Sequence, residues 1–325
     1  MSEISEKENL QLVLDGKKPA WLPNYGKAVQ RIRNTVLGSR KDPVTGYTVD
    51  AFGVEFLWTE DGRMPAYTTN NGKVVLKDVT KWKEIILDNK LKSLDWEGIA
   101  RDMLSNVDRD QKMISFDNNR IWDQFHYLMG FENALMALLE EPEACHDCMQ
   151  YLANYQIESI RLIYKYLKPD IIMFSEHIAT PLGLLMSPRT YREVIKPAHK
   201  KAFSAIAELG AIPQIHVDGL IEDVLPDLHE MGVKMLQPFQ VFNDINAAKA
   251  KYGFTAVGGW DAFGRGNQFD STEEEVRASV QLAMDNYGPG YRYVFNAGGI
   301  SRRYPEYNKW ASDEAYTYGR TFYHK

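Results

Sequence analysis

The sequence predicts an α/β protein in which parallel strands alternate with crossover helices. From about residue 150 onward, short apolar strands and helical segments follow one another five times in about 150 residues. Capping residues mark the helix starts and glycines mark the ends. In addition, each of five consecutive predicted strands is followed by a polar or glycine-rich segment. Together these observations predict a parallel sheet with a functional face at the strand ends.

Each element is defined by an apolar run and its flanking residues. Pro169 ends the first helix, Ser187-Pro188 opens the second, and Ser271-Thr272 precedes the three glutamates that begin the last. In chain order we predict helix 145–167, strand 170–175, helix 188–209, strand 212–216, helix 221–231, strand 234–237, helix 245–252, strand 254–258, helix 272–287 and strand 291–295.

The first half of the chain is less regular. Residues 47–78 mix strand-like runs with Gly53, Gly62, Pro65 and Gly72, so we expect an irregular, hairpin-like insertion without a core of its own. No Pro/Gly/Ser-rich linker separates the halves. Spacing alone is compatible with a closed barrel or with an open doubly wound sheet, although the absence of a G-x-G-x-x-G motif weakens the dinucleotide-binding option.

Composition excludes several classes of function. The 325 residues are 44% hydrophobic and 25% charged, with a formal charge of −6 and no basic block, which argues against nucleic acid or an anionic membrane as partner. No apolar run approaches the roughly 20 residues of a membrane span, so we expect a cytoplasmic protein. Cys145 and Cys148 lack a second pair and are interpreted as an inert thiol pair, not as a metal or redox site.

Candidate functional residues follow the predicted strands, in chain order Glu176 and His177, His216 and Asp218, Gln240, Trp260 and Asp261, and Asn296. In a barrel, the carboxyl ends of the strands and the loops after them form the active face. His216 and Asp218 are two residues apart and therefore point to the same side of their strand.

Several segments, in this order, resemble the uroporphyrinogen decarboxylase superfamily, whose members include corrinoid-dependent methyltransferases. The resemblance covers residues 8–23, 78–96 and 130–132, the Ser187-Pro188 to Pro197 segment, His216-x-Asp218-Gly219, and Gly258-Gly259 through residues 296–299. It implies a (β/α)8 TIM barrel, formed by a single domain over residues 1–325, with the insertion near the barrel mouth.

Two departures from the superfamily narrow the function. Asp218 stands where the thiol-methylating members have the Cys of a zinc-binding His-x-Cys, and Gly298 stands near their second Cys position, so thiolate ligands are absent. The porphyrin decarboxylases grip carboxylates with arginines near the N-terminus, whereas this chain has no Arg before Arg31. The remaining resemblance is to the methyltransferase component of aryl-ether O-demethylases, particularly over residues 78–86 and 94–97.

This resemblance implies a small methylated substrate, an aryl methyl ether, whose methyl group passes to a corrinoid protein. We predict a zinc ion held by Glu176, His216 and Asp218, because a metal can stabilise charge on the departing oxygen. His177 is the candidate proton donor, with Glu176 and Asp261 as further catalytic carboxylates. The predicted substrate-binding residues are Asn24, Tyr25, Phe52, Trp58, Gln240, Trp260 and Asn296.

Structural interpretations of the same residues remain open. Glu176 could cap a helix, His216 could be an ordinary buried histidine, and Trp260-Asp261 could combine packing with an N-cap. The aromatic residues of the insertion could form a local core. At the level of function, the alternatives are a decarboxylase of the porphyrin type and a non-catalytic, ligand-binding barrel.

Overall fold

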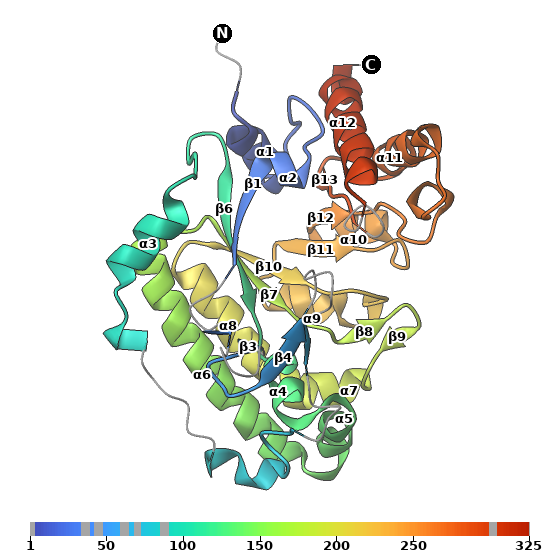
Figure 1. The fold of residues 1–325 in the computed structure, drawn as a ribbon. Coiled ribbons are helices and arrows are strands. Elements are labelled where there is room, and N and C mark those ends of the chain that lie inside the picture. The colour runs from blue at the N-terminus through green and yellow to red at the C-terminus, as the bar shows by residue number, and fades with distance from the viewer. Residues whose placement is uncertain are drawn as a thin grey trace.

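One parallel sheet organises the molecule (Figure 1). The computed structural model describes residues 4–33, 40–41, 48–58, 65–67, 73–84, 91–298 and 304–324. Seven strands pair side by side, all parallel, in the order β1-β6-β7-β10-β11-β12-β13. Their bounds are β1 Val29–Arg33, β6 Met113–Asn119, β7 Ile171–Ser175, β10 Ile212–His216, β11 Met235–Phe239, β12 Thr255–Gly258 and β13 Tyr293–Phe295.

The two ends of this sheet meet. Asn24 forms a parallel bridge with Phe295 of β13, and the Phe295 N–H donates to the Pro23 carbonyl at 3.0 Å. Because Asn24 lies shortly before β1, the last strand pairs with the segment that leads into the first. The predicted α/β, TIM-barrel-like fold is therefore confirmed.

Helices surround the strands, with α3, α6 and α8 on one side of Figure 1 and α11 and α12 on the other. Every helix and strand predicted beyond residue 145 has its counterpart in the structure. The helical segments are α1 Glu6–Leu14, α2 Tyr25–Ala28, η2 Val79–Glu84, η3 Leu91–Ser93, α3 Trp96–Leu104, α4 Trp122–Met129, α5 Phe131–Glu140, α6 Pro142–Leu167, α7 Pro188–Thr190, η4 Tyr191–Ile195, α8 Lys196–Glu208, η5 Glu222–Val224, α9 Leu225–Glu230, α10 Ile245–Tyr252, η6 Arg265–Asn267, α11 Glu273–Tyr287, α12 Pro305–Thr321 and η8 Phe322–His324.

The helix predicted after Ser187 is continuous but contains a π-helical turn, η4. Ser187 caps it by accepting from the Thr190 N–H. Pro197 has no N–H to donate to the Glu193 carbonyl, so the ordinary i→i−4 ladder is interrupted there. The Lys196 N–H instead bonds the Tyr191 carbonyl, five residues back, which explains the wider turn.

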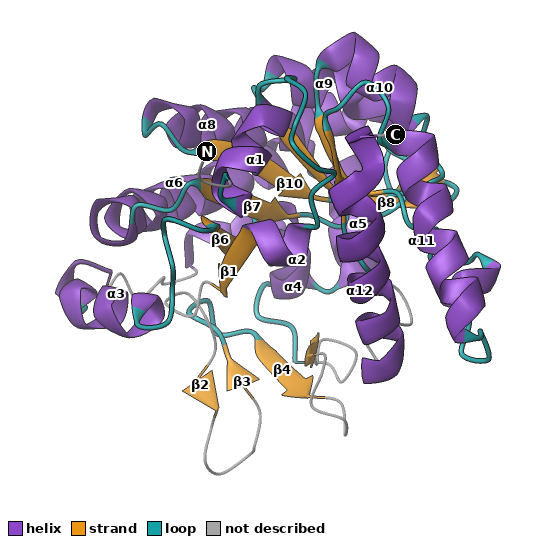
Figure 2. Ribbon diagram, turned by 90° about the horizontal axis from the view of Figure 1, so that it is seen from above, coloured by secondary structure: helices purple, strands orange, loops and turns teal. Residues whose placement is uncertain are grey.

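The amino-terminal end of the barrel is filled by apolar side chains. Val29, Met113, Ile171, Met235, Val257 and Val294, one from each of six strands, form a buried cluster with Leu10 and Val13 of α1. Figure 2 shows α1 in front of the strands at this end, with α6, α8, α9 and α10 around the outside. The amphipathic helix α1 therefore closes the end of the barrel opposite the mouth.

The irregular segment after β1 contains an antiparallel sheet in the order β2-β3-β4-β5, as expected for a hairpin-like insertion. Its strands are β2 Arg40–Lys41, β3 Thr48–Val49, β4 Glu55–Trp58 and β5 Pro65–Tyr67. It follows the carboxyl end of β1, which places it on the mouth side of the barrel. A short antiparallel hairpin, β8 Ala179–Thr180 and β9 Gly183–Leu184, follows β7 on the same side.

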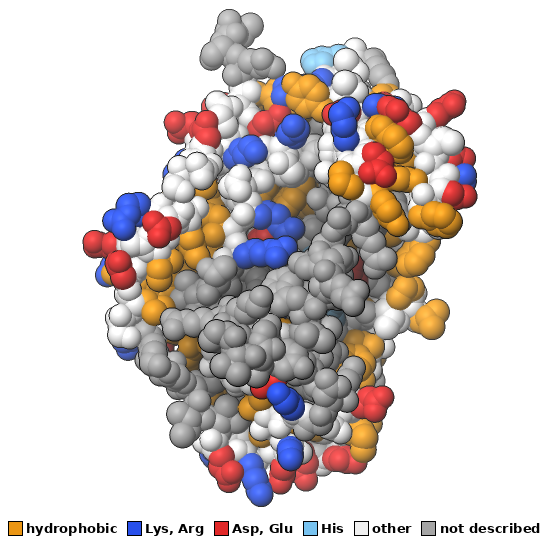
Figure 3. All heavy atoms as spheres, in the orientation of Figure 1, with side chains coloured by type: hydrophobic (Ala, Val, Ile, Leu, Met, Phe, Trp, Pro, Cys, Tyr) orange, Lys and Arg blue, Asp and Glu red, His pale blue; other side chains and the backbone are white. Residues whose placement is uncertain are grey.

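Within the described parts of the chain, no helix combines the length and the apolar character needed to span a bilayer. Acidic and basic side chains are intermixed on the face shown in Figure 3. Cys145 and Cys148 are free and buried in α6, and burial raises the pKa of both thiols to about 12. Both therefore stay protonated at neutral pH, as expected for an inert thiol pair.

Candidate metal centre

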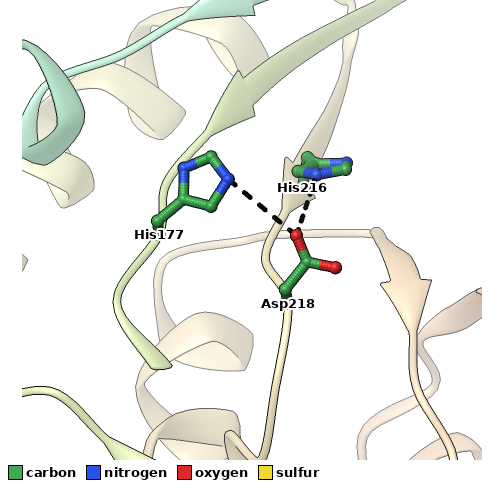
Figure 4. Close-up of side chains that lie close together, drawn as sticks. All are labelled: His177, His216 and Asp218. Atoms are coloured by element: carbon green, nitrogen blue, oxygen red, sulfur yellow. Dashed lines mark ion pairs between the residues drawn. The ribbon is translucent and has the colours of Figure 1, made fainter. Parts of the chain in front are cut away.

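Three potential metal ligands meet at the carboxyl ends of β7 and β10 (Figure 4). Ser175 pairs with His216 in the parallel ladder between β7 and β10. Because side chains alternate along a strand, His216 and the residues two positions after Ser175 and after His216 face the barrel interior. These residues are His177, His216 and Asp218. Asp218 Oδ2 lies 3.4 Å from His216 Nε2 and 3.9 Å from His177 Nε2.

Each imidazole is oriented by a hydrogen bond at its other nitrogen. His216 Nδ1 donates to Gln237 Oε1 at 2.6 Å, and His177 Nδ1 donates to Asp123 Oδ2 at 2.6 Å. With Nδ1 occupied in both rings, both Nε2 atoms face Asp218. Hydrogen-bonding one imidazole nitrogen to leave the other for a ligand is how metal-binding histidines are usually fixed.

The loop after β10 holds Asp218 in place. Gln240 Nε2 donates to Asp218 Oδ1 at 3.2 Å, and Gln240 Oε1 accepts from the Gly219 N–H at 2.6 Å. Gly219 has φ +94°, and a Cβ there would lie 2.5 Å from the Thr180 carbonyl oxygen. Glycine is therefore required at this position by both backbone conformation and close approach.

The electrostatics of the cluster favour a positive charge. The hydrogen bond to Asp123 is the main cause that raises the pKa of His177 to about 9, with Asp218 and Glu176 adding attraction. Although burial opposes ionisation of Asp123, hydrogen bonds from His126 and His177 lower its pKa below the ordinary range. Without a metal, His177 carries a proton at neutral pH and lies between two carboxylates.

The residues fit a zinc ion of the predicted kind. Zinc bonds to imidazole and carboxylate of about 2.0–2.1 Å set tetrahedral ligand atoms about 3.3 Å apart. The three ligand atoms here lie within 4.8 Å of one another, at distances of 3.4 and 3.9 Å for the pairs to Asp218. Two imidazoles and one carboxylate leave a fourth position open, as in catalytic zinc sites.

The predicted ligand Glu176 is not part of this cluster. It is fully buried and accepts from the Ile121 N–H at 2.7 Å and the Asp123 N–H at 3.1 Å, at the N-terminus of α4. The predicted set Glu176, His216 and Asp218 therefore needs correction, because the side chain of Glu176 leaves the strand on the helix side. His177 takes its place.

Three other predicted residues have contacts that define their positions. Gln240 contacts Asp218 directly, as described above. Tyr25 is buried in the barrel and its hydroxyl donates to Gln214 Oε1 at 3.0 Å. Asn24 caps α2 by accepting from the Gly26 N–H at 2.9 Å, and its backbone bridges to Phe295. These contacts give Tyr25 and Asn24 structural roles.

Two of the aromatic residues predicted to bind substrate pack against the outer helices. Phe52 is 5% exposed and its ring contacts Tyr155 of α6, so it packs the insertion against the helix layer. Trp260 is buried and its Nε1 donates to Ser279 Oγ of α11 at 2.8 Å. The Trp58 side chain lies outside the described residues.

Asp261 and Asn296 occupy the loops after β12 and β13. The exposed Asp261 accepts from the Phe263 N–H at 2.9 Å, which makes it a turn cap. Asn296 is half-buried directly after β13, at the barrel mouth. Substrate binding by Asn296 and catalysis by Asp261 stay predictions.

Comparison with known proteins identifies the family. Residues 49–308 match the uroporphyrinogen decarboxylase (URO-D) family. The chain belongs to the URO-D family. Over 99% of its length and 100% of the other chain, it is also similar in structure to a methyltransferase from Methanosarcina mazei, with a TM-score of 0.73 and 16% sequence identity. At that identity, the likeness concerns the fold.

A second solved structure matches in part. It is a B12-independent methionine synthase from Shewanella sp. W3-18-1, with a TM-score of 0.47 and 12% identity over 70% of this chain and 66% of that one. No curated protein matches the sequence.

In this URO-D family member, two residues that orient the cluster, Asp123 and Gln237, were not predicted as site residues. Asp123 lies in α4, after β6. Gln237 stands at the end of the predicted strand 234–237 but lies inside β11 in the structure. Strand pairing offered a signal for Gln237, because it is the register partner of His216. The role of Asp123 depends on how α4 packs against Glu176 and His177 after β7, which a local sequence pattern does not show.

Proposed function

We propose that this URO-D family protein is a methyltransferase that cleaves a small methylated substrate, an aryl methyl ether, and passes the methyl group to a corrinoid carried by a partner protein. The observation that carries the proposal is the convergence of His177, His216 and Asp218 at the barrel mouth. The full-length likeness in fold to a methyltransferase supports it. The resemblance of residues 78–86 and 94–97 to the O-demethylase group supplies the substrate class.

The proposed cofactor is zinc held by His177, His216 and Asp218. When bound, zinc would supply Lewis-acid stabilisation of negative charge on the ether oxygen as its bond to the methyl carbon breaks. Two histidines and a carboxylate also suit iron(II), so metal analysis is part of the test. Thiolate is absent from the set, so the site is matched to an oxygen-bearing leaving group and not to thiol activation.

The protein's own residues have distinct roles in this proposal. Asp218 contributes a negative charge and is fixed by Gln240, so that it stays between the two imidazoles. Gln237 and Asp123 fix the two ring orientations. His177 cannot be a metal ligand and a proton donor through the same Nε2 at the same time. We therefore assign it as a ligand, and the predicted general-acid role belongs to the metal-free state.

The test mixes the purified protein, loaded with zinc, with a reduced corrinoid protein and a panel of aryl methyl ethers and methylamines. Formation of methyl-cobalt, followed by absorbance, is the expected result. His216→Ala removes one ligand, so metal content and methyl transfer should fall together. Absence of a methyl-cobalt signal with every donor contradicts the proposal, and equal metal content in wild type and variant contradicts the ligand set.

One observation keeps decarboxylation as a second candidate. Arg31 and Arg33 alternate with Ile32, which packs in the core on the helix side of β1, so both arginines point to the inner side of the barrel. Arg31 donates through Nε to the buried Asp117 of β6. A carboxylated ring substrate would need these cations. Release of carbon dioxide from a porphyrinogen by the zinc-free protein would favour this candidate.

The third alternative, a non-catalytic ligand-binding barrel, is less well supported. A non-catalytic barrel would be favoured if the polar side chains at the barrel mouth pointed to separate places. His177, His216 and Asp218 do converge, and each forms a further hydrogen bond with a neighbouring element.

A further inference from the structure

Two buried carboxylates join helix α4 to the segment after β7. Each carboxylate accepts hydrogen bonds from the other's segment. Glu176 accepts the Ile121 and Asp123 N–H groups at the start of α4. In return, Asp123 of α4 accepts the backbone N–H of His177 at 2.7 Å and its ring Nδ1–H at 2.6 Å. The position of the His177 ring is therefore tied to α4 and not only to its own strand.

The Asp123 carboxylate contacts His177 and two side chains of its own helix. It is 1% exposed, and its two oxygens also lie 3.3 Å from His126 Nε2 and 3.3 Å from the Tyr127 hydroxyl. Both of these groups belong to α4 itself. They hold the carboxylate in a single orientation, from which it can reach both donor groups of His177.

The two histidines of the metal centre differ in how much they depend on such a partner. The side chain of His216 is 15% exposed and lies within a strand, so packing restricts its ring. The side chain of His177 is 49% exposed and lies after its strand ends. Its partner Asp123 is charged, whereas the partner of His216 is the neutral amide of Gln237. A charged acceptor forms the stronger hydrogen bond.

We propose that Asp123 is the positioning residue of the metal centre, holding His177 with Nε2 directed at Asp218 and at the bound metal. The inference rests on the proposed metal at this site, but not on the reaction proposed there. A carboxylate that orients a metal-binding imidazole in this way also strengthens it as a ligand, and loss of such a partner typically weakens metal affinity 10- to 100-fold.

The experiment measures zinc affinity of the full-length protein by competition with a chromophoric chelator. The variants are Asp123→Ala and Asp123→Asn. Asn keeps the volume and one acceptor oxygen but not the charge, so it should weaken binding less than Ala does. Asp227→Asn is the matched control. Asp227 is also a buried carboxylate, 5% exposed, and it accepts from Lys196 at 2.7 Å in the contact between α8 and α9.

We expect a 10- to 100-fold loss of zinc affinity in Asp123→Ala, a smaller loss in Asp123→Asn, and wild-type affinity in Asp227→Asn despite its lower melting temperature. The cobalt(II)-substituted forms of wild type and Asp123→Asn should also differ in their visible spectra. Unchanged affinity in both Asp123 variants, an equal loss in Asp227→Asn, or a wild type that binds no zinc overturns the proposal. Methyl donor and corrinoid are absent, so a failed methyl-transfer assay leaves this result unaffected.

Discussion

At the residue scale, the Glu176 carboxylate stabilises the N-terminus of α4 instead of binding metal. Glu176→Gln keeps one acceptor oxygen but leaves a buried N–H of α4 without a partner. We expect it to lower stability by about 1–3 kcal/mol, which is the usual cost of such an unsatisfied group. The stoichiometry of bound zinc should stay that of the wild type. Urea denaturation and metal analysis measure the two effects, and a variant without metal would restore Glu176 as a ligand.

His177 gives the metal-free protein a pH-dependent stability. Its pKa rises from 6.5 to about 9 on folding, so the folded state holds the proton more tightly than the unfolded state does. The stabilisation is fully present below pH 6.5 and is lost as pH rises through about 9. The difference in melting temperature between wild type and His177→Gln, without metal, should therefore shrink between pH 6.5 and 9. A constant difference would contradict this.

Neighbouring residues show which parts of the site could be predicted from sequence. His216 and Asp218 were paired correctly, because both follow one strand at a spacing of two. Glu176 and His177 are adjacent, and a choice between them needs the register of β7 against β10, where Ser175 opposes His216. If the register of β7 shifted by one residue, every side chain that faces the barrel interior would face the helices instead. The register joins residues 41 positions apart in the chain, such as Ser175 and His216, and a local sequence pattern does not encode it.

At the element scale, the loop after β10 depends on a glycine. Gly219→Ala introduces a Cβ at 2.5 Å from the Thr180 carbonyl oxygen, in addition to the strain of φ +94°. The loop must shift, and Asp218 moves with it, so zinc affinity should fall along with the melting temperature. Gly232→Ala is the control, because it has φ +82° but open space around its Cβ. A zinc affinity that is equal in the two variants would contradict the argument.

Helices were easier to predict than strands because their caps are local. Thr272 and Glu275 form the reciprocal hydrogen bonds of a capping box, and Gly253 adopts φ +70° at the end of α10, both as the sequence indicates. β11 extends two residues beyond its predicted end at Gln237, across the cis Gln237–Pro238 bond. A proline normally ends such a strand, so local reasoning placed the boundary too early.

At the scale of the whole molecule, α1 stabilises the barrel by filling its amino-terminal end. Leu10 is fully buried there among strand residues. Leu10→Ala should lower the free energy of unfolding by about 2–5 kcal/mol, as for other large-to-small changes in a core. Zinc affinity should not change, because the cavity forms at the opposite end from the metal centre. Denaturant unfolding and the chelator competition assay test the two statements.

Local sequence patterns do not predict that the barrel closes. Closure depends on Asn24 meeting Phe295, and nothing local to either residue marks the pair. Alternating strands and helices are equally compatible with an open sheet. The closed form was expected only because ordered segments along the chain resemble a barrel superfamily, and the match of residues 49–308 to the URO-D family agrees with that expectation.

Leu10 and Val13 of α1 fill the amino-terminal end of the barrel, so the proposed ligands would enter from the mouth. Under the proposed function, the methyl donor and the corrinoid would then approach from the same side, with the smaller molecule bound deeper in the barrel. Demethylated product would be trapped until the larger partner withdraws. Turnover would consequently be limited by separation of the two proteins, and raising the concentration of the acceptor beyond saturation should slow the cycle.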